Sequence, residues 1–265
     1  MAISLSQITF KKIQGFAYKR LIDYKISKIR TLPRKQPGYF SFYGYTVNYI
    51  DSLGFFHQYK DIFKDKIYHF TSVSRTPNII DAGGCIGMST LYFKLLYPDA
   101  KITVFEPDPQ IFKILSNNIS NNNLSGVTLV NAALGKQTGI MDFYPDNSDG
   151  GSMYAINDRP AISVPVTKLS DYINEPVDLL KIDIEGMEGE VFEEIEHKLY
   201  LIREIVFEYH DFHNLPQKLG MILTILERNG FSYLIADATN MGIQTPFTLS
   251  KNYSYLNIVY AKKLE

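Results

Sequence analysis

Short apolar segments alternate with amphipathic segments along most of the chain. Five apolar segments have the length and β-branched content of buried strands; they cover residues 78–84, 101–107, 127–134, 177–186 and 204–210. Apolar positions spaced by three and four residues predict helices between or after them, over residues 88–97, 109–120, 189–200 and 218–230. Strands separated by helices predict an α/β fold with a parallel sheet covered on both faces. Segments 231–237 and 255–263 have no helix between them and predict a hairpin that closes the sheet.

The first 30 residues show a different pattern. Apolar residues recur at helical spacing while basic residues fill other positions, which predicts an amphipathic helix with a cationic face. Its apolar stripe consists of Phe10, Ile13, Ala17, Leu21 and Tyr24. Such a helix either packs on the main domain or on a second subunit of a homo-oligomer, or it docks on an anionic membrane surface or a polyanionic acceptor. Nucleic acid is not expected as a partner, because no arginine-rich recognition motif accompanies the charge.

Residues 33–77 are rich in aromatic residues and glycine. Residues 38–50 have the composition of strands, with a break at Gly44, and residues 59–70 predict a short helix. We interpret this region as a cap or an oligomerisation segment, whose tyrosines either line an acceptor pocket or only pack. The sequence thus predicts two parts, an N-terminal helix and cap over 1–76 and a main domain over 77–265.

Composition and charge restrict the class of protein. The 265 residues are 45% hydrophobic and 21% charged, which is typical of a globular protein. No apolar run is long enough to span a bilayer and the start lacks a secretory signal, so we expect a cytoplasmic protein, or one peripheral to the inner membrane face. The single cysteine, Cys85, excludes an internal disulfide and a cysteine zinc cluster. Residues 1–35 hold nine Lys and Arg against one acid, whereas the rest holds eighteen against twenty-seven.

The loop after the first main-domain strand predicts a ligand site. Loops at such strand ends bind ligands in α/β sheets, and glycine permits close backbone approach at residues 83, 84 and 87. The spacing of Gly83, Gly84 and Gly87 differs from the G-x-G-x-x-G of pyrophosphate binders. Asp81 would repel a pyrophosphate and attract an ammonium group, which favours an amino-acid-like cofactor over NAD.

Glu106 ends the second strand of the main domain. A carboxylate at that position can accept hydrogen bonds from both hydroxyls of an adenosine ribose. Asp81, the glycines and Glu106 therefore predict one cofactor site across two neighbouring strand ends.

The chain resembles the FkbM-type S-adenosylmethionine-dependent methyltransferases over about residues 77–210. The resemblance rests on five motifs in order: DAGGCIG (81–87), VFEPDP (104–109), NAALG (131–135), KIDIEGMEGEVF (181–192) and FEYH (207–210). It implies a Rossmann-like class I methyltransferase fold with a seven-stranded, mostly parallel sheet and a terminal antiparallel hairpin. It also implies methyl transfer chiefly to hydroxyls of sugars or polyketide-like products. The family usually shows Gly-Ala-Asn or similar after its first acid, so Gly84-Cys85 is a departure.

The resemblance also implies roles for residues of the cofactor site. Asp81, Gly83, Gly84 and Gly87 would hold the methionine part of S-adenosylmethionine, and Glu106 would hold its ribose. Asn131 and Ala132 would contact adenine, and Asp183 would border the cofactor.

Four ionisable residues at the ends of two later strands are candidates for the acceptor side. Strand alternation puts Asp183 and Glu185 on one side of their strand, and likewise Glu208 and His210. A hydroxyl acceptor needs a base or a metal that lowers its pKa. One hypothesis makes His210 the general base, with an ordinary pKa of about 6.5, and Asp183 and Glu185 further catalytic residues. A second has Asp183, Glu208 and His210 bind Mg²⁺. A third gives these residues a structural role, with Lys181 paired to a nearby acid.

Residues 144–160 are polar and contain glycine, and we expect them to form a lid over the active site. Ser152 and Tyr154, together with Asp149 and Glu208, are candidates to hydrogen-bond a sugar acceptor.

These observations together predict an O-methyltransferase that uses S-adenosylmethionine, with or without Mg²⁺, on a hydroxyl of a glycan or a glycosylated or secondary metabolite. Three alternatives stay open: N-methylation of an amino sugar, an NAD(P)-dependent oxidoreductase, and a non-catalytic cofactor-binding partner protein. The acceptor itself cannot be named, because a fold does not specify a substrate.

Overall fold

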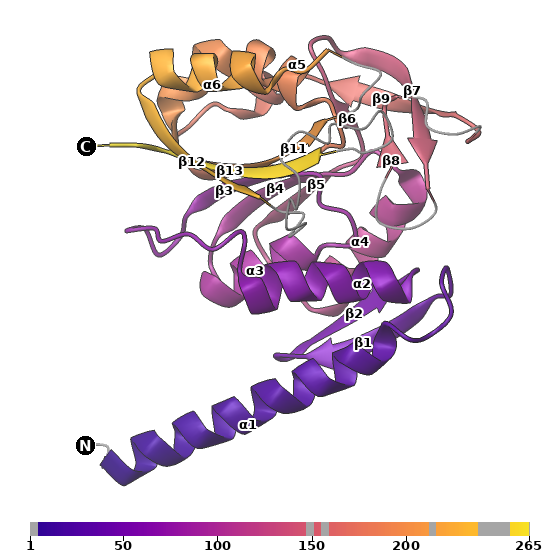
Figure 1. The fold of residues 1–265 in the computed structure, drawn as a ribbon, viewed down its shortest axis with the longest axis vertical. Coiled ribbons are helices and arrows are strands. Elements are labelled where there is room, and N and C mark those ends of the chain that lie inside the picture. The colour runs from indigo at the N-terminus through magenta and orange to yellow at the C-terminus, as the bar shows by residue number, and fades with distance from the viewer. Residues whose placement is uncertain (1–4, 147–150, 155–158, 212–215, 238–254, 265) are drawn as a thin grey trace, which may run out of the picture.

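A seven-stranded sheet forms the centre of the molecule (Figure 1). The computed structural model describes residues 5–146, 151–154, 159–211, 216–237 and 255–264. The strands are β3 (Asn78–Ala82), β4 (Lys101–Phe105), β5 (Val127–Val130), β10 (Val177–Ile182), β11 (Ile202–Asp211), β12 (Phe231–Asp237) and β13 (Tyr255–Lys263). Their order is β12-β13-β11-β10-β3-β4-β5, and only β13 runs antiparallel to its neighbours. The predicted parallel sheet with a terminal hairpin is confirmed.

Helices cover both faces of this sheet (Figure 1). One face carries α3 (Met88–Leu96) and α4 (Pro109–Asn121), and the other carries α5 (Glu188–Ile195) and α6 (Leu219–Arg228). Helix α4 begins at Asp108, whose side chain accepts the N–H groups of Gln110 and Ile111. Pro109 at its first position lacks the N–H that would otherwise need a partner. The Asp108 cap and Pro109 therefore stabilise the start of α4 directly beside the end of β4.

A smaller four-stranded sheet lies beside the main one and was not predicted. It consists of β6 (Ala133–Leu134), β7 (Gly139–Pro145), β8 (Gly151–Ser152) and β9 (Ile162–Thr167), in the order β6-β9-β7-β8. Two short 3₁₀ helices, η2 (Leu169–Tyr172) and η3 (Glu196–Leu201), follow β9 and α5. Val164 and Val166 are buried in β9, but Pro165 between them obscures the strand pattern, because proline is rare inside sheets. The end of β7 and all of β8 lie within residues 144–160, so part of the predicted lid is strand.

The N-terminal segment packs against the face that carries α3 and α4 (Figure 1). It comprises α1 (Leu5–Ile29), the hairpin β1 (Gly38–Phe42) and β2 (Tyr45–Tyr49), α2 (Ser52–Gln58) and a π-helical turn η1 (Tyr59–Asp65). The ring of Phe42 meets those of Tyr59 and Phe63 edge-on, at 5.4 and 5.0 Å. Phe63 in turn meets Tyr92 of α3 at 5.3 Å. Aromatic packing thus joins this segment to the sheet domain.

Helix α1 is present as predicted, but it buries a different face. Ile22, Ile26 and Ile29 are buried, whereas Leu21 and Tyr24 of the predicted apolar stripe are 48% and 61% exposed. Both sides of this helix carry apolar residues, and tertiary packing decides which side is buried. No described helix has the length and apolar character needed to cross a membrane.

Candidate functional site

The loop between β3 and α3 is a tight glycine turn at the edge of the sheet. Gly83 has a φ of +86°, and a Cβ there would lie 1.8 Å from the carbonyl oxygen of Asp183. A Cβ on Gly84 would lie 2.2 Å from Cγ1 of Val104. The N–H groups of both glycines donate to the carbonyl of Phe105, at 3.0 and 2.8 Å. Only glycine fits at these positions, so the loop lies close against the ends of β4 and β10.

We expected Asp81 to face the ligand space, but it does not. Its side chain is fully buried, and its carboxylate accepts hydrogen bonds from the hydroxyls of Ser89 and Thr90, at 2.6 and 2.8 Å. Its other oxygen lies 3.4 Å from Nζ of Lys181. Because Ser89 and Thr90 are in the first turn of α3, Asp81 fixes the helix start behind the glycine loop. Gly87, with a φ of +95°, forms the entry to this helix.

Glu106 lies at the end of β4 and faces the ligand space. One carboxylate oxygen accepts the N–H of Cys85 at 3.0 Å, and the other accepts the N–H of Asp108 at 2.9 Å. Burial raises the pKa of Glu106 to about 8, although both backbone hydrogen bonds lower it. A carboxylate held in this way still has lone pairs for hydroxyl donors. Its position is the one expected for ribose binding.

A cavity of about 700 Å³ extends from this loop to the small sheet. Its polar side is formed by Gly83, Cys85, Glu106, Asp108, Asp146, Asp183 and Glu185. Its apolar side is formed by Phe105, Ile111, Ala132, Ala133, Leu134, Phe143, Met153, Ile184 and Met187. Asn131 is not part of the wall, because its amide donates to the carbonyls of Glu106 and Pro107 at 2.8 and 3.2 Å. Asn131 thus supports the turn that carries Glu106, while Ala132 lines the cavity.

A second cavity, of about 860 Å³, lies on the other side of the same strand ends. All four predicted acceptor-side residues line it, namely Asp183, Glu185, Glu208 and His210. The predicted convergence of these groups at one sheet edge is therefore confirmed. Asp183 and Glu185 also line the first cavity. These two carboxylates stand at the boundary between the two cavities.

The N-terminal segment supplies much of the second cavity, which the sequence did not reveal. His57, Gln58, Asp61, Ile62, Ile67 and Tyr68 come from α2, η1 and the chain just after them. Nε2 of Gln58 donates to Sγ of Cys85 at 3.3 Å, so the segment touches the glycine loop directly. A π-helical turn such as η1 is uncommon and is frequently found at functional sites.

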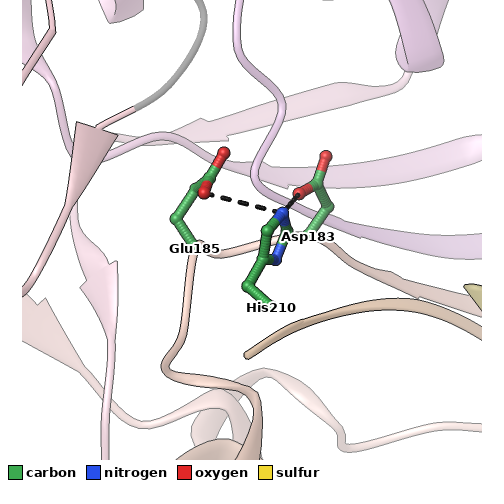
Figure 2. A group of neighbouring side chains, drawn as sticks. All are labelled: Asp183, Glu185 and His210. Carbon is green, nitrogen blue, oxygen red and sulfur yellow. Dashed lines mark ion pairs between the residues drawn. The ribbon is translucent and has the colours of Figure 1, made fainter. Parts of the chain in front are cut away.

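His210 is surrounded by carboxylates (Figure 2). Its Nε2 lies 3.9 Å from Asp183 and 3.5 Å from Glu185, and its Nδ1 lies 3.1 Å from Glu188. Burial lowers the pKa of His210, but these carboxylates more than offset burial, so its pKa is well above the usual value. The expectation of an ordinary pKa near 6.5 was wrong. The raised pKa favours the protonated form of this side chain, whose positive charge balances that of the carboxylates.

Tyr68 is a buried member of the site that the sequence analysis missed. Its hydroxyl donates a short hydrogen bond to Glu208 and lies 3.4 Å from Asp183, while Nζ of Lys181 lies 5.3 Å from its ring centre. Burial and, second, the negative charge of Asp183 raise the pKa of Glu208 to about 7. The hydrogen bond from Tyr68 lowers the pKa of Glu208. No sequence pattern links residue 68 to residue 208.

The residues that lie close enough to share one cation differ from those predicted to bind Mg²⁺. Within the described part of the chain, ligand atoms of Asp183, Glu185 and His210 lie within 4.8 Å of one another. Glu208 is not in this group, because its carboxylate faces Tyr68. The geometry thus exchanges Glu208 for Glu185. Glu185 and Cys85 both have left-handed backbone angles, with φ of +52° and +44°. Such strain in non-glycine residues clusters at functional sites.

Ser152 and Tyr154 do not line the second cavity. Ser152 is buried, donates to the carbonyl of Glu185 at 3.1 Å and accepts the N–H of Tyr154. It therefore supports the strained turn at Glu185 and has no direct path to an acceptor. Tyr154 lines a third cavity, of about 430 Å³, with His210 and Lys218. Asp149, the other lid residue proposed to bind an acceptor, lies outside the described residues.

Comparison with known proteins identifies similar sequences. A sequence model of the methyltransferase FkbM domain matches residues 81–233. Methyltransferase 1 of Beauveria bassiana (strain ARSEF 2860) is 31% identical over 204 residues, which cover 67% of this chain and 81% of that protein. Methyltransferase sdnD of Sordaria araneosa is 31% identical over 65% of this chain and 80% of its own length. The 2-O-methyltransferase NoeI of Sinorhizobium fredii (strain NBRC 101917 / NGR234) is 30% identical over 51% of this chain and 64% of its own length.

A solved structure shares the fold. The crystal structure of a methyltransferase FkbM from Methylobacillus flagellatus KT matches with a TM-score of 0.50 and 16% identity. The match covers 72% of this chain and 45% of that chain.

Proposed function

The chain belongs to the family of FkbM methyltransferases and is an S-adenosylmethionine-dependent enzyme, and we propose that it methylates a hydroxyl of a glycan or a glycosylated metabolite. The observation that carries this proposal is the shared wall of two cavities. Asp183 and Glu185 line both the 700 Å³ and the 860 Å³ cavity. A transferase must bring two ligands together at one point, and these strand ends are where the two spaces meet. We call them the cofactor cavity and the acceptor cavity.

The residues of the cofactor cavity suit S-adenosylmethionine. The backbone of the glycine loop forms a cradle at the cavity wall, and Gly83 lets this loop lie against the carbonyl of Asp183, where a Cβ would clash. Glu106 offers carboxylate oxygens to a ribose, and the apolar wall around Ala132 offers a slot for a flat base. When bound, this cofactor supplies a methyl group on a sulfonium, so that an acceptor oxygen gains the methyl as the bond to sulfur breaks.

The protein's own task is then to orient the acceptor hydroxyl and receive its proton. We assign this task to the carboxylates of Asp183 and Glu185, at the boundary of the cavities. His210 holds both carboxylates in place through its Nε2 (Figure 2), and Glu188 contacts its Nδ1. The proton released by the hydroxyl enters this cluster and leaves through the half-exposed carboxylates. His210 is thus a positioning and charge-balancing residue in our proposal, and the proton acceptor is the cluster.

The charge of the acceptor cavity favours neutral or cationic acceptors. Five lining residues bear carboxylates, namely Asp61, Asp146, Asp183, Glu185 and Glu208, against one lysine and two histidines. An anionic acceptor such as a uronic acid would be repelled by this lining. A neutral sugar hydroxyl fits it, and the relative named as a 2-O-methyltransferase supports oxygen as the acceptor atom. N-methylation of an amino sugar is the second candidate, because the same lining attracts an ammonium group.

Mg²⁺ is an alternative occupant of the carboxylate cluster. Three ligand atoms close enough to share one cation support it. Against it stands the raised pKa of His210, which favours the protonated ring, because a histidine binds metal only in its neutral form. A bound cation would have to displace that proton.

Two titrations test the proposed cofactor. Calorimetry of the purified protein with S-adenosylhomocysteine and, separately, with NAD⁺, each with and without Mg²⁺, should show binding of S-adenosylhomocysteine alone. Binding of NAD⁺ alone would contradict the cofactor assignment. An affinity for S-adenosylhomocysteine that is the same with and without Mg²⁺ is expected if His210 keeps its proton.

Transfer of a radiolabelled methyl group tests the acceptor. Matched methyl glycosides of a neutral sugar, an amino sugar and a uronic acid should be used at equal concentration. The expected order places the neutral sugar first and the uronic acid last. Label on the amino sugar alone, with the methyl group located on its nitrogen by mass spectrometry, would shift the proposal to N-methylation. Preference for the uronic acid would contradict the charge argument. Glu185→Gln should abolish transfer. Glu204→Gln is the matched control, because Glu204 is partly buried near the start of β11 and lines neither cavity.

A further inference from the structure

Helix α1 has two apolar faces, and the body of the protein covers only one of them. Ile22, Ile26 and Ile29 pack inward and are 8% exposed or less. Leu21 and Tyr24 point outward, with 48% and 61% of their surface exposed. The exposure of both side chains is unusual, because large apolar groups gathered on one helix face generally have a partner.

The outward face is regular. Positions 17, 21, 24 and 28 are separated by three and four residues and therefore lie along one side of the helix. Ala17, Leu21, Tyr24 and Lys28 occupy them, and all four are exposed. Nζ of Lys28 lies 5.2 Å from the ring centre of Tyr24. We call this set the outward face of α1.

The charge around this face is strongly positive. Residues 1–35 carry nine Lys and Arg against one acid. That acid, Asp23, accepts a hydrogen bond from the hydroxyl of Tyr59 at 2.8 Å, so it is turned toward the body. Exposed Lys25 borders the outward face. The other residues of the chain have nine more acids than bases, so positive charge is concentrated in this one region.

From these observations we propose that the outward face of α1 docks the protein on an anionic phospholipid bilayer. Leucine and tyrosine would enter the headgroup region, as in helices that lie in the interface. The lysines reach past them to lipid phosphates, because long basic side chains keep their charge at the polar level. Figure 1 shows α1 running past the hairpin of β1 and β2 and out from the body, which leaves room for a flat surface.

Other occupants fit the observations less well. Two copies of this helix placed face to face would bring like charges together, which destabilises a dimer. Nucleic acid would satisfy the lysines, but it offers nothing that buries Leu21 and Tyr24. An anionic bilayer satisfies both features. This inference does not depend on the acceptor proposed above.

Vesicle sedimentation tests the proposal on the full chain. The protein should bind vesicles of phosphatidylcholine with phosphatidylglycerol and should not bind vesicles of phosphatidylcholine alone. The double variant Leu21→Gln with Tyr24→Gln should weaken binding by about tenfold or more, since it removes the apolar groups that enter the bilayer. Glutamine keeps a high helix propensity, so α1 should stay helical. Lys25→Ala with Lys28→Ala should weaken binding by about fivefold for each lysine.

A matched control uses the same residue types elsewhere. Tyr200 and Leu234 are 70% and 66% exposed on the main body. The variant Tyr200→Gln with Leu234→Gln should bind anionic vesicles as the parent protein does. Affinity for S-adenosylhomocysteine should be equal in all variants and confirms that each one is folded.

Several results would overturn the proposal. They are an absence of binding to the anionic vesicles, equal loss in the control variant, and equal binding to both kinds of vesicle. Another is dimerisation without vesicle binding. If the parent protein dimerised with rising concentration and the Leu21 and Tyr24 variant did not, the outward face would be assigned to a second copy of the chain. A further result is binding to duplex DNA without vesicle binding. If the Leu21 and Tyr24 variant bound DNA as tightly as the parent, the basic residues of α1 would be assigned to nucleic-acid binding.

Discussion

The cofactor cavity and the acceptor cavity meet at Asp183 and Glu185, but they are built from different parts of the chain. Every lining residue of the cofactor cavity lies between residues 83 and 187, within the segment that matches the FkbM domain. The acceptor cavity borrows Gln58, Asp61 and Tyr68 from the N-terminal segment, which precedes that match. In our proposal, the segment that matches the family model therefore binds the cofactor, while a separate segment of this chain shapes the space for the acceptor.

The electrostatics of the two cavities differ as well. In the cofactor cavity the buried carboxylates are Glu106 and Asp108, and both accept hydrogen bonds from backbone N–H groups. The acceptor cavity holds a network in which Asp81, Lys181, Asp183, Glu208 and Tyr68 interact. Substitutions should therefore separate into those that affect cofactor affinity and those that affect turnover, stability or acceptor choice.

The largest expected effect is that of Gly83→Ala on the cofactor cavity. The new Cβ would meet the carbonyl of Asp183 at 1.8 Å, at a φ of +86°. Overpacking and the left-handed backbone together should cost about 3 kcal/mol or more of stability. The loop has to move away from Asp183 to relieve the clash, so the affinity for S-adenosylhomocysteine should fall strongly as well. Calorimetry measures this loss directly.

Gly44→Ala is its matched control. Gly44 has a φ of +87°, but no atom lies within 4 Å of a Cβ placed there. Its variant should lose about 1–2 kcal/mol of stability from the backbone alone and should keep the affinity of the parent. Equal loss of affinity in both variants would mean that Gly83 acts through global stability and not through the cradle.

The second effect is that of Glu106→Gln on affinity and on its pH dependence. Loss of charged hydrogen bonds to a ribose should weaken S-adenosylhomocysteine binding by about 1.5–3 kcal/mol. Because the pKa of Glu106 is about 8, the free protein holds a proton there at pH 7. A ribose that donates two hydroxyls favours the ionised form, so affinity should rise with pH by up to about tenfold per unit and level off above pH 8. Calorimetry from pH 6 to about pH 9 should show this rise in the parent and a flat profile in the variant.

The sheet and its strand ends could be predicted because buried parallel strands are continuous apolar runs, and their carboxyl ends meet at one edge. That argument alone brought Asp183, Glu185, Glu208 and His210 together. The face that α1 buries could not be predicted, because Leu21 and Ile22 are equally apolar and only the packed body distinguishes them.

The charge state of His210 was equally hidden in the sequence. It depends on Glu188, at the start of α5, which the fold brings to 3.1 Å from Nδ1. Tyr68 reaches Glu208 from 140 residues earlier in the chain. Contacts of this length follow from the tertiary fold and leave no local pattern.

The third effect is the loss of stability caused by Tyr68→Phe, a substitution in the acceptor cavity. Removing the hydroxyl leaves the buried carboxylate of Glu208 without this donor, which should cost about 1–3 kcal/mol. Tyr233 donates to Glu227 at 2.7 Å in an exposed pair, so Tyr233→Phe is the matched control and should cost less than about 0.5 kcal/mol. Urea unfolding compares the two, and affinity for S-adenosylhomocysteine should be unchanged in both. A loss of cofactor affinity in Tyr68→Phe would show that the two cavities are coupled. It would contradict the expectation that substitutions in one cavity leave the other unaffected.

The smallest expected effect is that of Asp61→Asn on acceptor choice. Nζ of Lys60 lies 3.0 Å from Asp61 and 2.8 Å from Asp65, so either substitution removes one carboxylate from the same lysine. Only Asp61 lines the acceptor cavity. Asp61→Asn should therefore reduce the preference for a neutral over a uronic acid glycoside by about two- to fivefold, the range of a partly screened charge interaction. Asp65→Asn should leave this preference unchanged. Equal shifts in both variants would place the effect on Lys60, and no shift in either would mean that the strand-end carboxylates alone set the charge preference, with the N-terminal segment acting through shape.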